Sequence, residues 1–310
     1  MGRRTDSRSE PVDGLLLLNK PSGLTSNQAL QKVKRLLNAR KAGHTGSLDP
    51  SATGMLPLCF GEATKVCAFL LDADKTYRVT ARLGVATDTG DADGSETQTA
   101  EVPELSAEQW QDLLSGFLGD SEQVPPMYSA LKQGGQRLYK MARRGETVER
   151  KPRPIRIDAI SLLENAGNRL VFRVHCSKGT YVRTLVEDIA AKAGTVAHTA
   201  HLHRENVAGF ESADMLDLNS IEHAAKGDLQ GLRERLLPPD AALQGMPDVT
   251  LDQIGADRFR AGQEISTCSE GAPGLVRVYS EAKEFLGVGE LSGNGSLAPK
   301  RVFQLGEKNP

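Results

Sequence analysis

The chain has 310 residues, of which 39% are hydrophobic and 25% are charged, and its formal net charge is -2. These values are typical of a globular protein with room for one large domain and a smaller one. Apolar runs such as residues 15–18 are too short to span a bilayer or to form the core of a signal peptide, so we expect a cytoplasmic protein.

Hydrophobic periodicity predicts alternating strands and helices along most of the chain. In order, we expect a strand at 14–19, a helix that Ser26 caps, a helix at 62–71, a strand at 75–83, a helix at 107–117, a basic helix at 137–143, strands at 155–163 and 170–176, a helix at 180–193 that Thr180 caps, and a strand at 196–203. Composition changes after Leu236, and short strands at 275–279 and 285–290 predict a small β-barrel at the end.

Basic residues are clustered although the net charge is close to zero. Nine Lys or Arg lie between Lys132 and Arg156 against two Glu, and residues 1–48 carry nine basic groups against three acidic ones. Segregated charge of this kind can form a local anion-binding face, and a solvated helix face is the alternative interpretation.

Metal sites are not expected. The four cysteines contain no CxxC pair, so neither disulfides nor structural zinc are predicted for Cys59, Cys67, Cys176 and Cys268. The cluster His198, His201 and His203 lacks an acidic or sulfur partner at a typical spacing. The loop 87–94 resembles a calcium loop only in Asp91-x-Asp93-Gly94, and its twelfth position is Ala100 rather than Glu.

The segment 43–57 is the strongest candidate for a catalytic loop. It places Asp49 among three glycines and two prolines, which allow close backbone approach and fix the geometry around one carboxylate. Such a loop suits nucleophilic catalysis by a carboxylate, although an Asp before Pro is also a common turn residue. No P-loop, GxGxxG or GxSxG motif is present, so nucleotide cofactors and a Ser nucleophile are not expected.

Several ordered motifs resemble the TruB-type family of tRNA pseudouridine synthases. They are Asn19-Lys20-Pro21-x-Gly23-x-Thr25-Ser26, Gly43-His44-Thr45-Gly46-x-Leu48-Asp49-Pro50, Asp74-Lys75-x-Tyr77, the loop 87–94, Pro126 to Lys132, and Cys176 to Thr184. The resemblance implies an α/β (α+β) catalytic domain around a mixed, mainly antiparallel sheet in residues 1–245, with an RNA-gripping insertion at about 124–153. Residues 246–310 resemble a PUA domain, an RNA-binding β-barrel.

The resemblance also implies the activity and the residues that carry it. The expected reaction is isomerisation of the T-loop uridine of tRNA, uridine-55, to pseudouridine after base flipping, with no cofactor, metal or protein partner and with the T-arm as the bound element. Asp49 would be the essential carboxylate, Arg183 its ion-pair partner and Tyr77 an active-site base or stacking group. RNA or base contacts are expected from His44, Lys20, Pro21, Tyr181, Leu202, Arg204, Lys132 and Arg143. Core packing is the alternative for Tyr181 and Leu202, and a surface ion pair is the alternative for Lys20.

Two departures from the family pattern are Asn19, where many members have Asp, and His203, where Arg is more usual. Three other functions are weighed against the tRNA enzyme: an RNA-binding or folding factor without chemistry, a glycosidase or base-releasing N-glycosylase, and an RNA-guided rRNA synthase. The complete Asp49 loop disfavours an RNA-binding factor without chemistry. A glycosidase usually needs two carboxylates, whereas only one acid lies in this loop, which disfavours a glycosidase.

Overall fold

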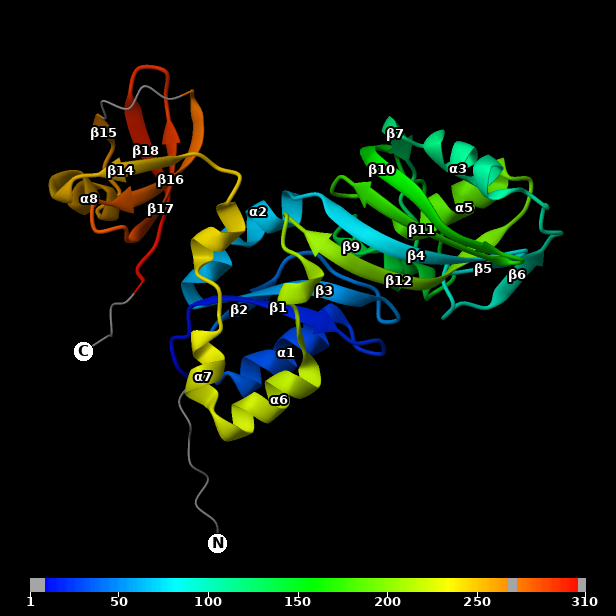
Figure 1. The fold of residues 1–310 in the computed structure, drawn as a ribbon, viewed down its shortest axis with the longest axis horizontal. Coiled ribbons are helices and arrows are strands. Elements are labelled where there is room, and N and C mark those ends of the chain that lie inside the picture. Colours follow the sequence, from blue (N-terminus) through cyan, green and yellow to red (C-terminus); the bar gives the residue numbers. More distant parts are fainter. Residues whose placement is uncertain (1–8, 267–271, 306–310) are drawn as a thin grey trace, which may run out of the picture.

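The computed structural model describes residues 9–266 and 272–305, so Cys268 lies outside the described residues (Figure 1). The strands are β1 (Gly14–Lys20), β2 (Ala42–His44), β3 (Thr53–Phe60), β4 (Lys75–Leu83), β5 (Val85–Thr87), β6 (Glu96–Thr99), β7 (Gly119–Gln123), β8 (Lys132–Gln133), β9 (Gln136–Arg137), β10 (Arg153–Ala166), β11 (Arg169–Cys176), β12 (Ala197–Val207), β13 (Leu216–Asp217), β14 (Asp248–Leu251), β15 (Ile265–Ser266), β16 (Gly274–Ser280), β17 (Phe285–Leu291) and β18 (Ser296–Val302).

The helices are α1 (Ser26–Leu36), α2 (Cys67–Asp72), α3 (Ala107–Ser115), α4 (Leu138–Ala142), α5 (Val182–Lys192), α6 (Leu218–Gly227), α7 (Leu229–Glu234) and α8 (Gln253–Arg260). Three 3-10 helices in the described part of the chain are η1 (Gly61–Val66), η2 (Ser212–Asp214) and η3 (Pro239–Leu243). In the same part, no helix has the length and apolar character needed to cross a membrane.

The large sheet is mixed and mainly antiparallel, as the sequence predicts. Its strand order is β13-β1-β3-β12-β4-β11-β10-β7, with β2 paired to β3. The pairs β1–β13 and β3–β12 are parallel, and the other pairs along this order are antiparallel. Because β12 lies between β3 and β4, it brings the segment after residue 49 next to the strand that carries Tyr77.

Helices cover one face of this sheet. Every second side chain of β4 is buried, and Tyr77, Val79 and Ala81 belong to the same hydrophobic core as Leu185 and Ile189 of α5. Figure 1 shows α3 and α5 beside β10, β11 and β4. The period-two pattern predicted for 75–83 is therefore the pattern of a strand with one face in the core.

The cap assignments made from the sequence are wrong at two helices. Thr25, not Ser26, is the N-cap of α1, and it forms a capping box with Gln28. Tyr181, not Thr180, precedes α5, and the Thr180 hydroxyl donates instead to the Ser177 carbonyl at 3.0 Å. At α1 the local capping box selects Thr25, whereas at α5 the Thr180 hydroxyl is bonded to Ser177 and Tyr181 makes no side-chain cap.

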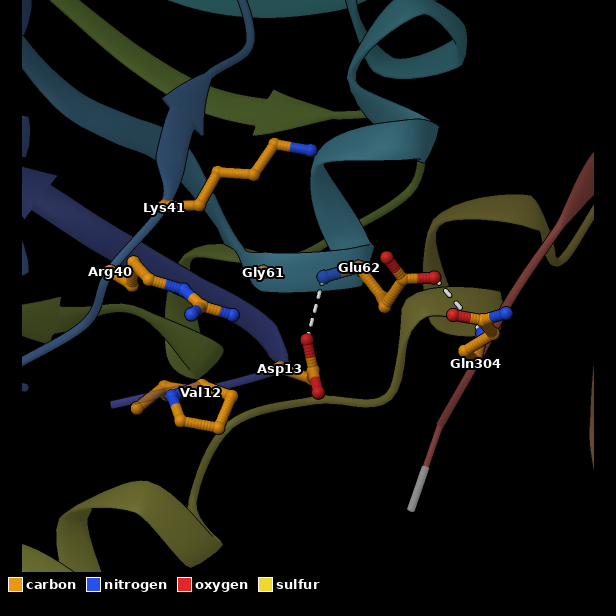
Figure 2. A pocket seen from close by; sticks show the side chains of 8 residues that line it. Val12, Asp13, Arg40, Lys41, Gly61, Glu62 and Gln304 are labelled. Carbon is orange, nitrogen blue, oxygen red and sulfur yellow. Dashed lines mark hydrogen bonds between the residues drawn. The ribbon is translucent and has the colours of Figure 1, made fainter. Parts of the chain in front are cut away.

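The helix predicted at 62–71 is two segments, η1 followed by α2. A 3-10 turn aligns side chains three positions apart, and it brings Glu62 into an ion pair with Lys65. This pair connects the first part of the chain to the residues at the end of β18. Lys65 Nζ donates to the Val302 carbonyl at 2.7 Å, and the Gln304 amide donates to Glu62 at 2.9 Å (Figure 2).

The second sheet has the order β14-β16-β17-β18-β15 and packs against α8 around its own core. Figure 1 shows it as a separate lobe at the upper left, and its curled sheet agrees with the small PUA-like fold predicted. Phe303, just after β18, enters a core shared with Leu15 and Met55 of the large sheet. The two lobes are therefore joined by apolar packing as well as by the contacts of Lys65 and Glu62.

Candidate active site

Asp49 lies in the loop that connects β2 to β3, and three side chains hold the backbone of this loop. The Ser26 hydroxyl accepts from the Leu48 amide at 2.8 Å and donates to the Leu48 carbonyl at 3.1 Å. Lys20 Nζ donates to the Pro50 carbonyl at 3.2 Å. Arg204 donates to the carbonyls of Gly46 at 3.2 Å and Met55 at 2.6 Å. The residues on both sides of Asp49 are thus fixed from the protein interior.

Glycine is required where the loop meets Arg204. Gly54 has φ +98°, and a Cβ there would lie 2.3 Å from the Arg204 carbonyl oxygen. No side chain fits such a distance, and the positive φ itself disfavours other residues. Gly54 therefore allows the backbone after the Asp49 loop to pack directly against the backbone of β12.

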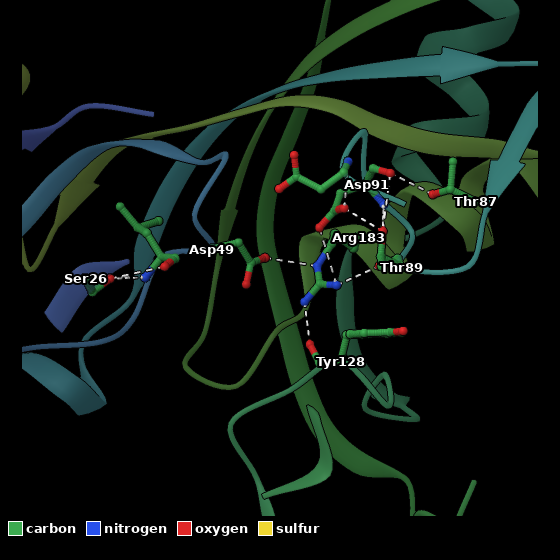
Figure 3. A network of polar contacts seen from close by, with 9 residues as sticks. Ser26, Asp49, Thr87, Thr89, Asp91, Tyr128 and Arg183 are labelled. Atoms are coloured by element: carbon green, nitrogen blue, oxygen red, sulfur yellow. Dashed lines mark hydrogen bonds and ion pairs between the residues drawn. The ribbon is translucent and has the colours of Figure 1, made fainter. Parts of the chain in front are cut away.

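Arg183 is the central cation of the site (Figure 3). Its Nε lies 3.0 Å from Asp49 Oδ2, and its Nη1 lies 3.6 Å from Asp91 Oδ2. The guanidinium also donates to the carbonyls of Thr89 at 2.6 Å and Tyr128 at 2.7 Å. The Arg183 side chain is only 7% exposed, whereas the Asp49 side chain is 39% exposed, so the cation is fixed while the carboxylate remains accessible.

Asp91 organises the loop 87–94 that was considered for calcium. Its carboxylate accepts from the Thr89 hydroxyl at 2.6 Å and from the Asp93 amide at 3.2 Å, while its carbonyl accepts from the Thr87 hydroxyl at 2.7 Å. Of the three acidic residues in this loop, Asp91 is the one that pairs with Arg183.

The ionisation of the site reflects burial and the neighbouring charges. Burial raises the pKa of Asp49, whereas Arg183 and Lys20 lower it and Asp91 raises it further. Burial lowers the pKa of Lys20 to about 8, although Asp49 opposes this shift. Lys20 is fully buried, so the surface ion pair considered from sequence is wrong for this residue.

The two tyrosines predicted for the site lie within electrostatic reach of Asp49. Burial raises the pKa of Tyr77 and of Tyr181, and the negative charge of Asp49 raises both further. Tyr77 is paired with Arg204 across β4 and β12, and the Tyr181 backbone exchanges hydrogen bonds with the Gln123 side chain. The phenol of Tyr77 is thus neutral at ordinary pH.

The other predicted residues surround this centre at different depths. His44 ends β2, and the pKa of its imidazole is lowered by burial and by Arg204. Leu202 lies on β12 and packs partly against the main core, and the Pro21 carbonyl accepts from Lys20 Nζ. Arg204 is only 1% exposed, and the contacts described here are to backbone carbonyls of the Asp49 loop.

The basic insertion meets the buried centre through the Tyr128 carbonyl, whereas its cationic side chains Lys132 and Arg143 lie at the surface. Lys132 lies in the short β8–β9 hairpin, and Arg143 follows α4 with its guanidinium 5.6 Å from the Tyr139 ring centre. Both side chains are exposed. Their part in RNA binding stays a prediction.

The histidine cluster does not converge. His198 Nδ1 lies 2.8 Å from the Val85 carbonyl, and His203 Nδ1 lies 2.8 Å from the Thr53 hydroxyl. In residues 9–266 and 272–305, the group able to place three metal-ligating atoms together is Asp74, Asp158 and His175. Arg156 pairs with both of these acids, at 3.7 and 2.8 Å, so a single guanidinium already interacts with the two carboxylates.

A hollow of about 200 Å³ lies at the junction of the two lobes and is lined by Pro11, Val12, Asp13, Arg40, Lys41, Gly61, Glu62 and Gln304 (Figure 2). The strands β2 and β3 have two ends: one carries the Asp49 loop, and at the other Ala42 pairs with Phe60. The hollow lies at the Ala42–Phe60 end, away from Asp49. Asp13 is bonded to the Glu62 amide, so this hollow holds mixed charges and no group that faces Asp49.

The sequence did not predict that Ser26, Asp91 and Tyr128 contribute contacts to the candidate active site. The Ser26 hydroxyl was assigned to a helix cap, and Asp91 belongs to a motif that the resemblance included without a role. The Tyr128 contact is made by a backbone carbonyl, which no residue type reveals.

Comparison with known proteins supports a common ancestry over the whole chain. Family models match residues 34–182 (TruB family pseudouridylate synthase, N-terminal domain), 183–244 (tRNA pseudouridylate synthase B C-terminal domain) and 247–303 (Pseudouridine synthase II TruB, C-terminal). The tRNA pseudouridine synthase B of Nitrosococcus oceani is 48% identical over 98% of this chain and 98% of its own. That of Dechloromonas aromatica is 51% identical over 96% of this chain and 97% of its own.

Solved structures share the fold at lower identity. A Cbf5–Nop10–Gar1 complex matches with a TM-score of 0.74 and 22% identity, over 97% of this chain and 88% of that chain. An H/ACA RNP bound to a substrate RNA containing 2'-deoxyuridine matches with a TM-score of 0.71 and 22% identity, over 94% and 85%.

The sheet, the Asp49 loop and these similarities define an RNA pseudouridine synthase, an isomerase. Within this class, the chain belongs to the TruB family of pseudouridylate synthases.

Proposed function

We propose that the protein converts the T-loop uridine of tRNA, uridine-55, to pseudouridine with Asp49 as the essential carboxylate. The observation that carries the proposal is the ion pair between the accessible carboxylate of Asp49 and the buried guanidinium of Arg183. The names of the relatives, tRNA pseudouridine synthase B, support tRNA as the substrate.

In this reaction the C1'–N1 bond breaks, the uracil turns, and a C5–C1' bond forms while the C5 hydrogen leaves as a proton. Asp49 acts at the sugar or the base, and Arg183 keeps it ionised and oriented. Tyr77 stacks on the uracil. As a neutral phenol it is a poor base, so it can take up a proton only while its own hydroxyl proton passes to another acceptor. No group of the protein needs to be oxidised or reduced.

The target uridine must leave the folded T loop, which costs a few kcal/mol. We assign His44 to the space that the flipped base leaves, and Tyr181, Leu202 and Pro21 to the wall of the base pocket. Lys20 and Arg204 hold the Asp49 loop through hydrogen bonds to its backbone carbonyls. Lys132 and Arg143 of the insertion contact phosphates of the T-arm.

We further propose residues 1–245 as the catalytic domain, with the insertion at about 124–153, and residues 246–310 as a PUA-like RNA-binding domain. Support comes from the second sheet, which begins at Asp248, and from family models that end at 244 and begin again at 247. We expect the enzyme to act in the cytoplasm without a cofactor, metal or protein partner.

The test is to incubate purified protein with an unmodified tRNA transcript in the presence of a chelator and to map pseudouridine by carbodiimide labelling and primer extension. A single stop at the T-loop uridine supports the proposal. Modification elsewhere, or modification only after a guide RNA or protein partner is added, would overturn it.

A further inference from the structure

Two thiols outside the catalytic centre are brought together by the fold. Cys59 lies on β3 and Cys67 is the first residue of α2, and both side chains pack in the same hydrophobic core. Cys59 is fully buried, whereas Cys67 is partly exposed. Their spacing in the sequence resembles no redox motif. The two residues are brought together because the chain turns through η1 between β3 and α2.

The pair packs against β2, the strand that precedes the Asp49 loop. Gly43 of β2 is the register partner of Cys59. A Cβ at Gly43 would lie 3.3 Å from the Cys67 sulfur, so that sulfur packs against the Gly43 backbone. His44 follows immediately, and the Asp49 loop begins after it.

The pKa values of the two thiols shift in opposite directions. Hydrogen bonding with Cys59 lowers the pKa of Cys67, burial opposes this, and Lys41 lowers it further. Figure 2 shows the Lys41 side chain extending toward the helical segment after Gly61. The pKa of Cys59 is raised by the same hydrogen bond and by burial. An accessible thiol of lowered pKa beside a buried one is the arrangement of an attacking and a resolving cysteine.

We propose that Cys59 and Cys67 form a redox-active pair, which a hydroperoxide such as hydrogen peroxide converts to a disulfide that alters the Asp49 loop. The Cys67 thiol attacks the peroxide, whose O–O bond breaks to give a sulfenic acid and one water. The Cys59 sulfur then displaces the hydroxyl of the sulfenic acid, which leaves as a second water while the S–S bond forms. The pair loses two hydrogens, and a thiol reductant restores it.

The experiment uses the full-length folded protein treated with hydrogen peroxide, followed by alkylation and peptide mapping without reductant. We expect a cross-linked peptide that joins Cys59 to Cys67 and disappears with dithiothreitol. Amide hydrogen exchange of residues 43–49 should become faster in the oxidised protein and return on reduction. Neither measurement depends on the tRNA substrate, so the inference can fail separately from the proposed function.

Cys67→Ser is the test variant because its site is partly exposed, and it should abolish the cross-link. Cys176→Ser is the matched control, since Cys176 is buried and its sulfur faces the Lys75 carbonyl, and it should leave the cross-link intact. Oxidation of Cys67 to a sulfinic acid without a cross-link to Cys59 would overturn the pair. A cross-link with unchanged exchange at 43–49 would overturn its effect on the loop.

Discussion

Arg183 and Asp49 are joined by a contact of 3.0 Å in which only the arginine is locked in place. The guanidinium is bonded to two backbone carbonyls and lies near a second carboxylate, Asp91. Asp49 is instead positioned by its neighbours Leu48 and Pro50, which Ser26 and Lys20 hold. The site is therefore assembled by two independent sets of contacts that meet at one ion pair.

Asp91→Asn should lower kcat by roughly 10- to 100-fold with a smaller change in KM, because Arg183 loses a charge partner and shifts relative to Asp49. Steady-state kinetics on a tRNA transcript would measure this. Asp93→Asn is the matched control, since Asp93 is exposed and meets Asp91 through its backbone amide alone. Equal losses in both variants would indicate a general effect of acidic charge in the loop.

The acid limb of the pH–rate profile should lie above the range of an ordinary aspartate, since burial raises the pKa of Asp49 and the ionised form is the active one. Asp91→Asn should move this limb to lower pH, and Arg183→Met should move it to higher pH, although with much less activity. Shifts of the acid limb in the opposite directions would contradict the assignment of this limb to Asp49.

The raised pKa of Asp49 also makes the stability of the folded protein depend on pH. Because the folded pKa of Asp49 exceeds the unfolded one, the unfolded chain ionises first as the pH rises, and the native state loses stability across that window. Asp49→Asn should therefore gain stability over wild type as the pH rises through this window in denaturant titrations. Its kcat should remain minimal throughout.

Ser26→Ala should cost about 1–3 kcal/mol of stability and also lower kcat, since it leaves the Leu48 amide without its partner next to Asp49. Thr25→Ala should cost about 0.5–2 kcal/mol through the lost cap of α1, with kcat unchanged. Urea unfolding and kinetics on the same preparations would separate the two effects. A normal kcat in Ser26→Ala would show that the loop does not need this anchor.

RNA binding should weaken as salt rises, and Lys132→Ala and Arg143→Ala should each reduce the slope of log Kd against log salt by about 0.7 to 0.9. Filter binding of a T-arm hairpin between low and moderate salt would measure the slopes. Arg169→Ala serves as the control because Arg169 pairs with Glu164. An unchanged slope in both test variants would remove the insertion from the RNA interface.

Local patterns predicted most of the fold. The strand at 75–83 has the predicted bounds because one face is in the core and the other is polar, which gives a clear period of two. The helix at 62–71 was predicted as one element because periodicity does not distinguish a 3-10 turn followed by an α-helix from one continuous helix. The resemblance implied a mixed, mainly antiparallel sheet, but the order of its strands was not predicted, since local pattern carries no information on which strands pair.

The candidate catalytic side chains were easier to predict than the residues that hold them in place. Asp49 and Arg183 stood out by residue type and motif, and the structure brings them together. Ser26, Asp91 and the Tyr128 carbonyl act across long sequence distances, so only the folded chain reveals their partners. Arg204 was predicted as an RNA contact, whereas its described bonds are to the Asp49 loop, and any RNA contact stays a prediction.

The central claim is that Asp49 carries pseudouridine formation, and tritium release tests it most directly. A T-arm hairpin with tritium at uracil C5 would be incubated with the wild-type protein and with Asp49→Asn, whose side chain has nearly the same shape. The account predicts stoichiometric release by the wild type, and release slowed by at least about 10³-fold in the variant, with hairpin affinity retained. Comparable release by both proteins would contradict the role of Asp49.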